Sequence, residues 1–170
     1  MMNIAEEAGK DPALRKKLAN PYLICPPDHG FSARQDSISM PRKDEDFDAW
    51  AAPFVMDAIN SRIVHRSNAL NGKAYGNNFT YNEAMLAGPG MGGRMKALGI
   101  GTGTGLFFAA AALKPTRWLL NKFVVPQPGE GPSPEAQKAG FYDIRFFGVT
   151  DNNDSIRVKV TGDADPGYGS

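Results

Sequence analysis

The sequence predicts an α+β fold, with a small antiparallel or mixed sheet of roughly three to five strands and helices packed mainly on one face. The first observation is a strand pair near the end of the chain. Residues 141–148 and 155–161 are apolar-rich, and the second run alternates Ile156, Val158 and Val160 with polar residues, which is the period of a half-buried strand. The second observation is the turn between them, Thr150–Asp154, whose Asn and Asp residues favour a hairpin loop.

Composition limits the class of protein. A chain of 170 residues has the size of one domain, and its 19 glycines and 13 prolines predict long loops. The net charge of +1 gives no general attraction to nucleic acid, so no nucleic-acid partner is expected. A single cysteine, Cys25, cannot form an internal disulfide, which favours an intracellular location. We expect an N-terminal helix and extended arm over 1–46 and one α+β domain over 47–170.

Helix signals mark two segments. Residues 1–19 read as helix with a break near Gly9, restarting at Asp11 as N-cap. Residues 57–71 read as a second helix, with Asp57 as its cap and Gly72 after its end. The apolar side of this second helix is expected to contain Ile59, Ile63 and Leu70.

The polar faces of the 57–71 helix have two interpretations. They are either a solvated surface or one wall of a site, in which Arg66 would grip a carboxylate or phosphate with parallel hydrogen bonds. His65 fits a surface or core histidine better than a catalytic base. Cys25 and His29 have no second pair of ligands in the sequence, so no metal site is expected.

Two further runs predict strands. Residues 50–55 read as a short strand or as the approach to the next helix. Residues 78–86 alternate like a strand, with Glu83 on the apolar side, where a carboxylate must either lie at the strand end or find a partner. We expect this strand in the same sheet as 141–148 and 155–161.

The most unusual composition lies between Ala84 and Gly129, which contains no acidic residue. Within it, Ala97–Leu113 is a run of 17 uncharged residues. Three interpretations remain open: a membrane-spanning helix, a buried helix whose glycines allow close packing, and a helix that touches a lipid surface. The basic residues around the run favour contact with anionic head groups; they are Arg94, Lys96, Lys114, Arg117 and Lys122.

The glycines of this run do not form a nucleotide-binding loop. The dinucleotide fingerprint is Gly-x-Gly-x-x-Gly after a strand. Counting from Gly99, the third glycine position is Thr104, and counting from Gly101 it is Leu106. We therefore expect no cofactor-binding residues here and no tight binding of a nicotinamide dinucleotide.

Five motifs in order resemble the saccharopine dehydrogenase-like oxidoreductases, including the trans-acting enoyl reductases of lipid synthesis. The resemblance covers roughly residues 8 to 170, without the Rossmann domain that begins members of this family. The motifs are Ala52–Met56, Ile59–Leu70, Tyr75–Glu83, Pro126–Ser133 and Gly162–Gly169.

The resemblance implies the substrate and dimerisation part of an NAD(P)-dependent reductase acting on a lipid-like acyl substrate. This implies NAD(P) for the full-length family, and a homodimer or a separate Rossmann domain as partner. It also implies that the chain is a piece of something longer and is not catalytic alone. No catalytic residue is assigned. The implied substrate-binding residues are Asn60, Arg66, Ser67 and Tyr168, with Arg66 as anion anchor and Tyr168 as a hydroxyl donor.

The alternative is a noncatalytic module that binds a membrane, a lipid droplet or a protein partner through residues 94–125. The location is then cytoplasmic, or peripheral on a membrane or lipid droplet.

Overall fold

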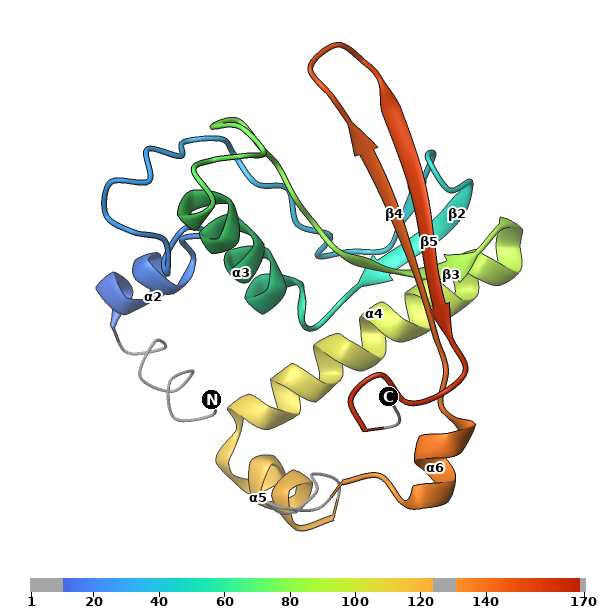
Figure 1. Ribbon diagram of the computed structural model, residues 1–170. Helices are drawn as coiled ribbons and strands as arrows, with labels where there is room; N and C mark the ends of the chain where they lie inside the picture. The colour runs from blue at the N-terminus through green and yellow to red at the C-terminus, as the bar shows by residue number, and fades with distance from the viewer. Residues whose placement is uncertain (1–10, 124–130, 169–170) are drawn as a thin grey trace. The chain divides into compact units, whose positions relative to one another are not determined.

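The computed structural model describes residues 11–123 and 131–168, in two compact units that divide after Leu120 (Figure 1). Residues 1–10 and 124–130 lie outside the described residues, and with them the helix predicted before Gly9 and most of the Pro126–Ser133 motif. The predicted boundary between residues 46 and 47 falls inside the first unit and stays a prediction.

The first unit begins with helix α2, Pro12–Leu18, and an extended arm. Asp11 caps the helix as predicted, because its carboxylate accepts hydrogen bonds from the N–H groups of Ala13 at 2.8 Å and Leu14 at 3.2 Å. The arm over 20–41 has no helix or strand, but it is anchored by three buried side chains. These are Tyr22, Phe31 and Ile38.

A three-stranded antiparallel sheet follows, in the order β1 (Arg42–Asp44), β2 (Ala49–Pro53) and β3 (Ala84–Gly88). The strand expected over 50–55 is thereby confirmed in β2. The strand expected over 78–86 is correct only from Ala84 onward, and residues 78–83 are loop. Ala51 and Ala52 in the central strand are fully buried, because helix α4 packs across this sheet.

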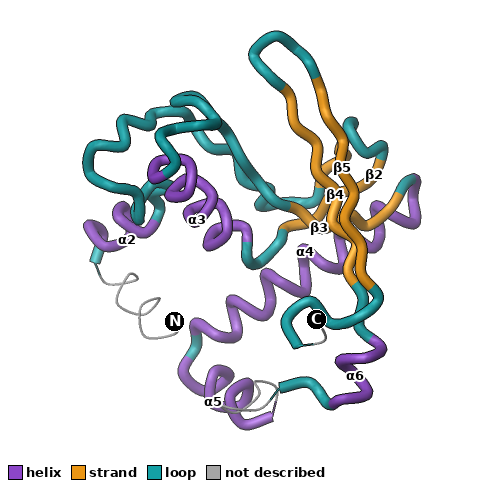
Figure 2. Tube along the Cα trace, in the orientation of Figure 1, coloured by secondary structure: helices purple, strands orange, loops and turns teal. Residues whose placement is uncertain are grey.

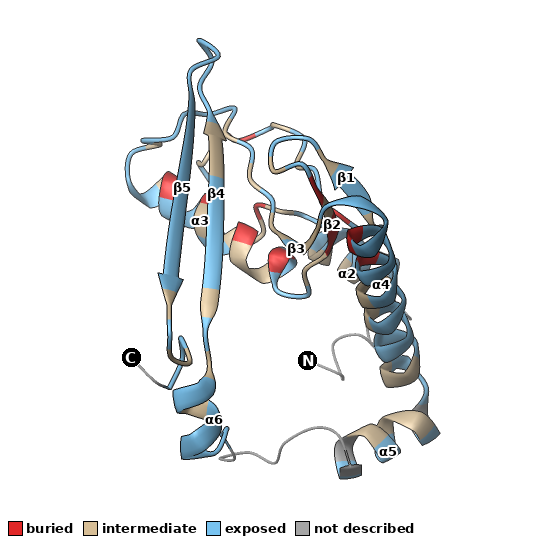
Figure 3. Cartoon of the chain, turned by 90° about the vertical axis from the view of Figure 1, so that its right-hand side faces the viewer, coloured by how far each residue is buried: buried red, intermediate tan, exposed pale blue. Residues whose placement is uncertain are grey.

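Helix α4, Gly90–Ala112, approaches the sheet closely at its first half (Figure 3). Gly93 and Ala97 are its buried residues, and Gly101 lies against the rings of Pro41 and Pro53. The helix is long and apolar enough to cross a membrane by length and composition, yet only 6% of its apolar window is buried. In this unit it is therefore not the buried core helix that one interpretation of the sequence predicted.

Helix α3, Asp57–Leu70, confirms the predicted helix over 57–71, but its buried face is polar. Ile63 and Leu70 are more than half exposed, so the predicted apolar side faces solvent. Asp57 does not cap the helix either, since Met56 occupies the cap position without a side-chain bond. The buried residues, spaced along one face, are Asp57, Ser61, His65 and Asn68.

Helix α5, Lys114–Phe123, follows α4 directly. The Thr116 hydroxyl donates to the carbonyl of Ala110 and lies 3.2 Å from that of Leu113, so it fixes the corner between the two helices.

The second unit contains helix α6, Pro134–Ala139, and the hairpin of β4 (Tyr142–Val149) and β5 (Ser155–Gly162) (Figure 2). Its register pairs Ile144 with Val160 and Phe146 with Val158, which confirms the predicted antiparallel pair. Asn153 takes a positive φ of 65° in the turn, as an Asn-rich loop allows.

The α+β class is confirmed, but the strands form two sheets and not one. The hairpin is a separate two-stranded sheet, and β3 pairs with β2 in the first unit. The prediction that residues 78–86 share a sheet with the hairpin is wrong. Residues 84–88 pair with β2 instead, and residues 78–83 form no strand because side chains of the first unit take up the N–H groups of residues 81 and 83.

Candidate functional site: a polar pocket beside helix α3

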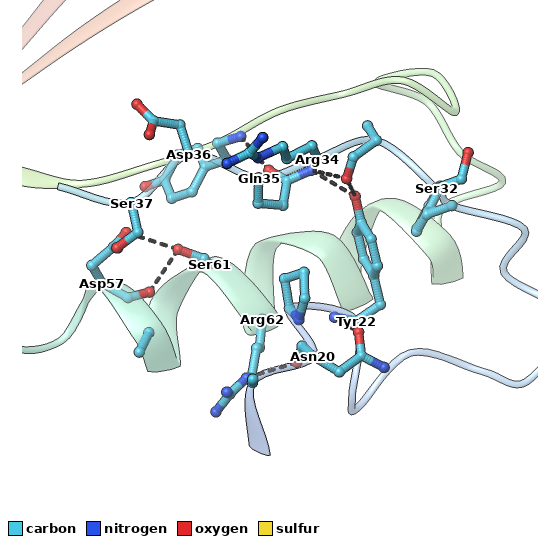
Figure 4. A pocket seen from close by; sticks show the side chains of 16 residues that line it. Asn20, Tyr22, Ser32, Arg34, Gln35, Asp36, Ser37, Asp57, Ser61 and Arg62 are labelled. Atoms are coloured by element: carbon cyan, nitrogen blue, oxygen red, sulfur yellow. Dashed lines mark hydrogen bonds between the residues drawn. The ribbon is translucent and has the colours of Figure 1, made fainter. Parts of the chain in front are cut away.

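The first unit contains a pocket of about 550 Å³ between the arm and the first half of α3 (Figure 4). Its walls are the arm segments 19–22 and 31–37, Tyr81, and four residues of α3, namely Asp57, Ala58, Ser61 and Arg62. Most side chains at its edge are polar. Because these walls come from segments far apart in the sequence, the pocket depends on the arm staying docked on α3.

The Asp57 carboxylate organises one end of the pocket. Its Oδ2 accepts the Ser37 hydroxyl at 2.9 Å, and its Oδ1 accepts the backbone N–H of Glu83 at 2.8 Å. The Ser61 hydroxyl lies 2.9 Å from the same Oδ1 and 2.6 Å from the Asp57 carbonyl oxygen. Asp57 is only 5% exposed, so one buried carboxylate ties the arm, α3 and the segment before β3 together.

Glu83 continues the network, and among residues 11–123 and 131–168 no basic side chain is bound to it. Its two carboxylate oxygens accept the Tyr81 hydroxyl at 2.7 Å and the Asn60 amide at 2.8 Å. The sequence left open whether this acid lies at a strand end or pairs with a base. It lies just before β3 and is held by neutral donors. Burial, together with the hydrogen bond to Glu83, raises the pKa of Tyr81, so its phenol stays protonated.

Gln35 links the arm to the loop before β3. Its amide nitrogen donates to the Tyr22 hydroxyl at 2.6 Å and to the Phe79 carbonyl at 3.2 Å, and its amide oxygen accepts the N–H of Tyr81 at 3.0 Å. The Tyr22 hydroxyl in turn donates to the Ala33 carbonyl at 2.6 Å. The back of the pocket is therefore a connected set of hydrogen bonds.

Among the described residues around the pocket, one basic side chain has neither a hydrogen bond nor an ion pair. Asp36 is paired with Arg42 at 2.7 Å, and Asp57 is held by its three donors. Arg62 donates to the carbonyls of Leu18 and Asn20, which stabilises the end of α2. Within residues 11–123 and 131–168, the guanidinium of Arg34 makes no hydrogen bond or ion pair.

His65 supports the pocket from behind. It is 1% exposed, and its Nε2 has no hydrogen-bond partner among the described residues. The ring centroids of Tyr22, Phe79 and Phe31 lie 5.0, 5.8 and 6.5 Å from that of His65. Burial lowers the pKa of His65, because its charged form would lose water in this aromatic surrounding. Tyr22 and Phe31 also line the pocket, so His65 packs against two residues of the pocket wall.

The lowered pKa of His65 predicts a specific pH dependence of stability. The unfolded chain takes up a proton near the ordinary pKa of about 6.5, whereas the folded chain resists it. The part of the unfolding free energy that comes from keeping His65 neutral is fully present above about pH 6.5, and it is lost as the pH falls toward the folded-state pKa. We expect the unfolding free energy in urea to fall between about pH 7.5 and pH 5.5, by up to ~1.4 kcal/mol per pH unit.

The matching variant is His65→Leu, which should remove this part of the pH dependence. His29→Leu, which changes the other histidine of the chain, should keep it. A His65→Leu protein whose stability falls with pH as steeply as that of the original chain would contradict the assignment.

Of the four residues that the sequence predicted to bind substrate, two lie on one face of α3. Others are hydrogen-bonded to neighbouring parts of the protein. Asn60 and Ser67 lie seven positions apart on α3, close to two full turns, but the amide of Asn60 is bound to Glu83. Arg66 is exposed and donates to the Ile24 carbonyl, which holds the arm. Tyr168 lies in the second unit, 63% exposed, with its N–H bound to Asp165. Their substrate-binding role stays a prediction.

The pocket-lining residues that sequence analysis did not identify are Gln35, Asp57, Ser37 and Arg34. The bonds from Ser37 to Asp57, from Asp57 to Glu83 and from Gln35 to Tyr81 each join residues 20 or more positions apart, so no local pattern marks these residues. The described residues contain no cluster of His, Cys, Asp and Glu able to hold a metal ion. Burial raises the pKa of the Cys25 thiol, and nearby Arg66 offsets part of this effect, so the cysteine is not an activated nucleophile.

The chain is similar to curated mycobacterial proteins. It is 33% identical, over 99% of its length, to a Mycobacterium tuberculosis protein named "Putative trans-acting enoyl reductase". It is also 33% identical over 93% of its length to the trans-acting enoyl reductase of Mycobacterium bovis, and 32% identical over 84% to that of Mycobacterium ulcerans. The chain covers 42%, 40% and 36% of these relatives, so it spans less than half of their length.

No protein-family profile matches the chain. No solved structure matches it either.

Proposed function

We propose that the chain is the substrate-side part of a trans-acting enoyl reductase-like oxidoreductase of the saccharopine dehydrogenase-like family, acting in lipid metabolism. The observation that carries this proposal is the similarity along nearly the whole chain to proteins of that name. The stretch of the relatives that this chain does not match would then provide the NAD(P)-binding domain. The chain alone would not be catalytic.

For an enoyl thioester, a bound nicotinamide would supply the hydride that reduces the carbon–carbon double bond, and a proton would complete the reduction. The cofactor provides the hydride, and the protein orients the acyl group and excludes water. The pocket beside α3 fits this second role, because hydrogen bonds hold its back wall in place and its walls combine polar and aromatic side chains.

We assign the anion anchor to Arg34 in place of Arg66. Arg34 lines the pocket, and the two carboxylates there are already neutralised or hydrogen-bonded. Arg66 does not line the pocket, and its guanidinium binds the Ile24 carbonyl. An acyl thioester carried on a phosphate-containing group would present its phosphate to Arg34.

A chimera tests the proposal. In it, this chain replaces the matching stretch of the M. tuberculosis relative, and NADPH oxidation is followed with a trans-2-enoyl coenzyme A thioester. We expect the chimera to oxidise NADPH only when the thioester is present. A chimera that binds NADPH like the parent but does not reduce the thioester, where the parent does, would contradict the proposal.

The same chimera tests whether Arg34 or Arg66 is the anion anchor. Arg34→Ala should raise the KM for the coenzyme A thioester about tenfold or more, since a charge-assisted hydrogen bond is lost. Arg66→Ala should leave this KM nearly unchanged. The uncharged N-acetylcysteamine thioester is the matched substrate control, because it has no phosphate and its KM should not respond to Arg34→Ala. An equal effect of both arginine variants would remove Arg34 as the anchor.

A second candidate function is a noncatalytic interaction module, which the exposure of α4 favours. A chimera that fails to reduce the thioester, while the chain still binds lipid vesicles, would support this second candidate. A homodimer remains a further proposal for the full-length protein.

A further inference from the structure

We propose that the outer end of α4, together with α5, inserts into one leaflet of an anionic lipid surface without spanning it. This proposal rests on the exposed side chains of α4 and α5 and not on the enzymatic proposal above. The inserting surface, here called the apolar tip, is defined by six exposed side chains. They are Leu106, Phe107, Phe108, Leu113, Trp118 and Leu119.

The apolar tip differs from an ordinary solvent-exposed helix. No charged residue occurs between Ala97 and Leu113, so α4 is apolar on every side over this length. A helix that is apolar all round is normally enclosed by a core or by lipid. Here Phe107 and Phe108 are 43% and 52% exposed, and Leu106 is 65% exposed. Exposed apolar groups of this size on one tip mark a surface that something covers.

Charge identifies lipid as the covering partner. Lys114, Arg117 and Lys122 follow the apolar run, and the stretch from Ala84 to Gly129 has no acidic residue, whereas Arg94 and Lys96 lie at the sheet end of α4. Helix α5 places exposed Trp118 and Lys122 four positions apart, which is the spacing of neighbours on one helix face. Trp and Lys side by side match the boundary between acyl chains and anionic head groups. A purely apolar protein partner would gain nothing from these cations, whereas an anionic lipid surface would.

The attachment of α4 to the sheet limits how deep the tip can go. Gly93 packs directly on Gly88, Ala97 is fully buried, and Gly101 touches Pro41. Only residues 102–112 extend beyond these contacts, which is about 17 Å of helix at ~1.5 Å per residue. The hydrocarbon core of a bilayer is ~30 Å thick, so this length cannot span it, and the basic residues that follow on α5 keep the tip near the head groups of one leaflet. Spanning would require α4 to leave the three-stranded sheet.

Vesicle flotation tests the proposal with the full chain and vesicles of phosphatidylglycerol and phosphatidylcholine. We expect flotation at low salt and reduced but persistent flotation at about 1 M salt, where the screening length falls to ~3 Å. Phe107→Glu with Phe108→Glu should lower the partition coefficient more than about tenfold, because each phenylalanine buried in lipid contributes more than a tenfold change. Leu70→Glu, a charge placed on an equally exposed leucine of α3, should change it less than about twofold.

Charge reversal and depth complete the test. Arg117→Glu with Lys122→Glu should abolish low-salt flotation, whereas Lys16→Glu with Lys17→Glu on α2 should not.

Trp50→Phe leaves Trp118 as the one tryptophan, and its fluorescence should be quenched by lipids brominated near the head group of the accessible leaflet. Circular dichroism confirms that each variant folds.

Three results would overturn the proposal. The first is the absence of flotation at low salt. The second is equal flotation of the Phe107→Glu, Phe108→Glu variant and the original chain. The third is a dimer in vesicle-free solution that this variant dissociates while vesicles do not bind, which would assign the tip to a second copy of the chain. None of these results decides whether the chimera reduces the thioester, because that assay needs no membrane.

Discussion

Replacing Asp57 with alanine is expected to lower the free energy of unfolding of the first unit by about 3 kcal/mol or more. The carboxylate is 5% exposed and accepts from Ser37, Ser61 and the N–H of Glu83. Its removal leaves these donors facing a small cavity, and a buried donor without a partner costs more than the net gain of one hydrogen bond. The pocket should loosen as well, because Asp57 joins three of its walls.

The measurement is urea unfolding followed by circular dichroism, with the change read as a shift of the midpoint at constant slope. Asp36→Ala is the matched control, since it also removes an aspartate of the pocket edge. Its ion pair with Arg42 is exposed, so the loss should stay below about 1 kcal/mol. Asp57→Asn keeps the shape of the side chain and one acceptor oxygen, so its loss of unfolding free energy should lie between those of Asp57→Ala and Asp36→Ala. Equal midpoints for Asp57→Ala and Asp36→Ala would show that the buried network does not hold the unit together.

A second large loss of stability is expected from adding one methyl group to a glycine of helix α4. A Cβ at Gly93 would lie 1.8 Å from the carbonyl oxygen of Gly88 and 2.4 Å from its carbon, both rigid backbone atoms. Gly93→Ala must therefore push the helix away from β3. We expect a loss of roughly 3 kcal/mol, at the upper end of overpacking effects.

Gly99→Ala is the control on the same helix. No atom lies within 4 Å of a Cβ built there, so the methyl group enters open space. Alanine favours the helix over glycine by about 0.5–1 kcal/mol, and this variant should be stabilised. Relative to the original chain, the thermal unfolding midpoint should fall for Gly93→Ala and rise for Gly99→Ala. If Gly93→Ala is as stable as Gly99→Ala, the close packing of α4 on the sheet is wrong, and with it the depth limit on the apolar tip.

Local sequence signals predicted the elements that depend on near neighbours. Asp11 before Pro12 marked the start of α2, and Gly72, with a φ of 62°, marked the end of α3. The alternation of residues 155–161 and the polar turn before them predicted the hairpin, whose register pairs every residue of β4 with one of β5. These signals act within a few residues, so the sequence alone contains them.

The face of α3 that is buried could be decided only by the tertiary structure. Apolar spacing favoured Ile59, Ile63 and Leu70, whereas the folded unit buries Asp57, Ser61, His65 and Asn68. Burying polar groups requires partners, and these lie far away: Ser37 is 20 positions from Asp57, and Glu83 is 26 positions from it. The Asn68 side chain is likewise bound to the backbone of Tyr75 and Gly76.

The start of β3 was decided in the same way. Residues 78–83 alternate like a strand, yet the N–H of Tyr81 binds the Gln35 side chain and the N–H of Glu83 binds that of Asp57. A backbone N–H taken by a side chain is not available to a neighbouring strand, so pairing begins only at Ala84. Alternation in a sequence shows which side chains can share a face. Which groups satisfy the backbone between them depends on segments that only folding brings together.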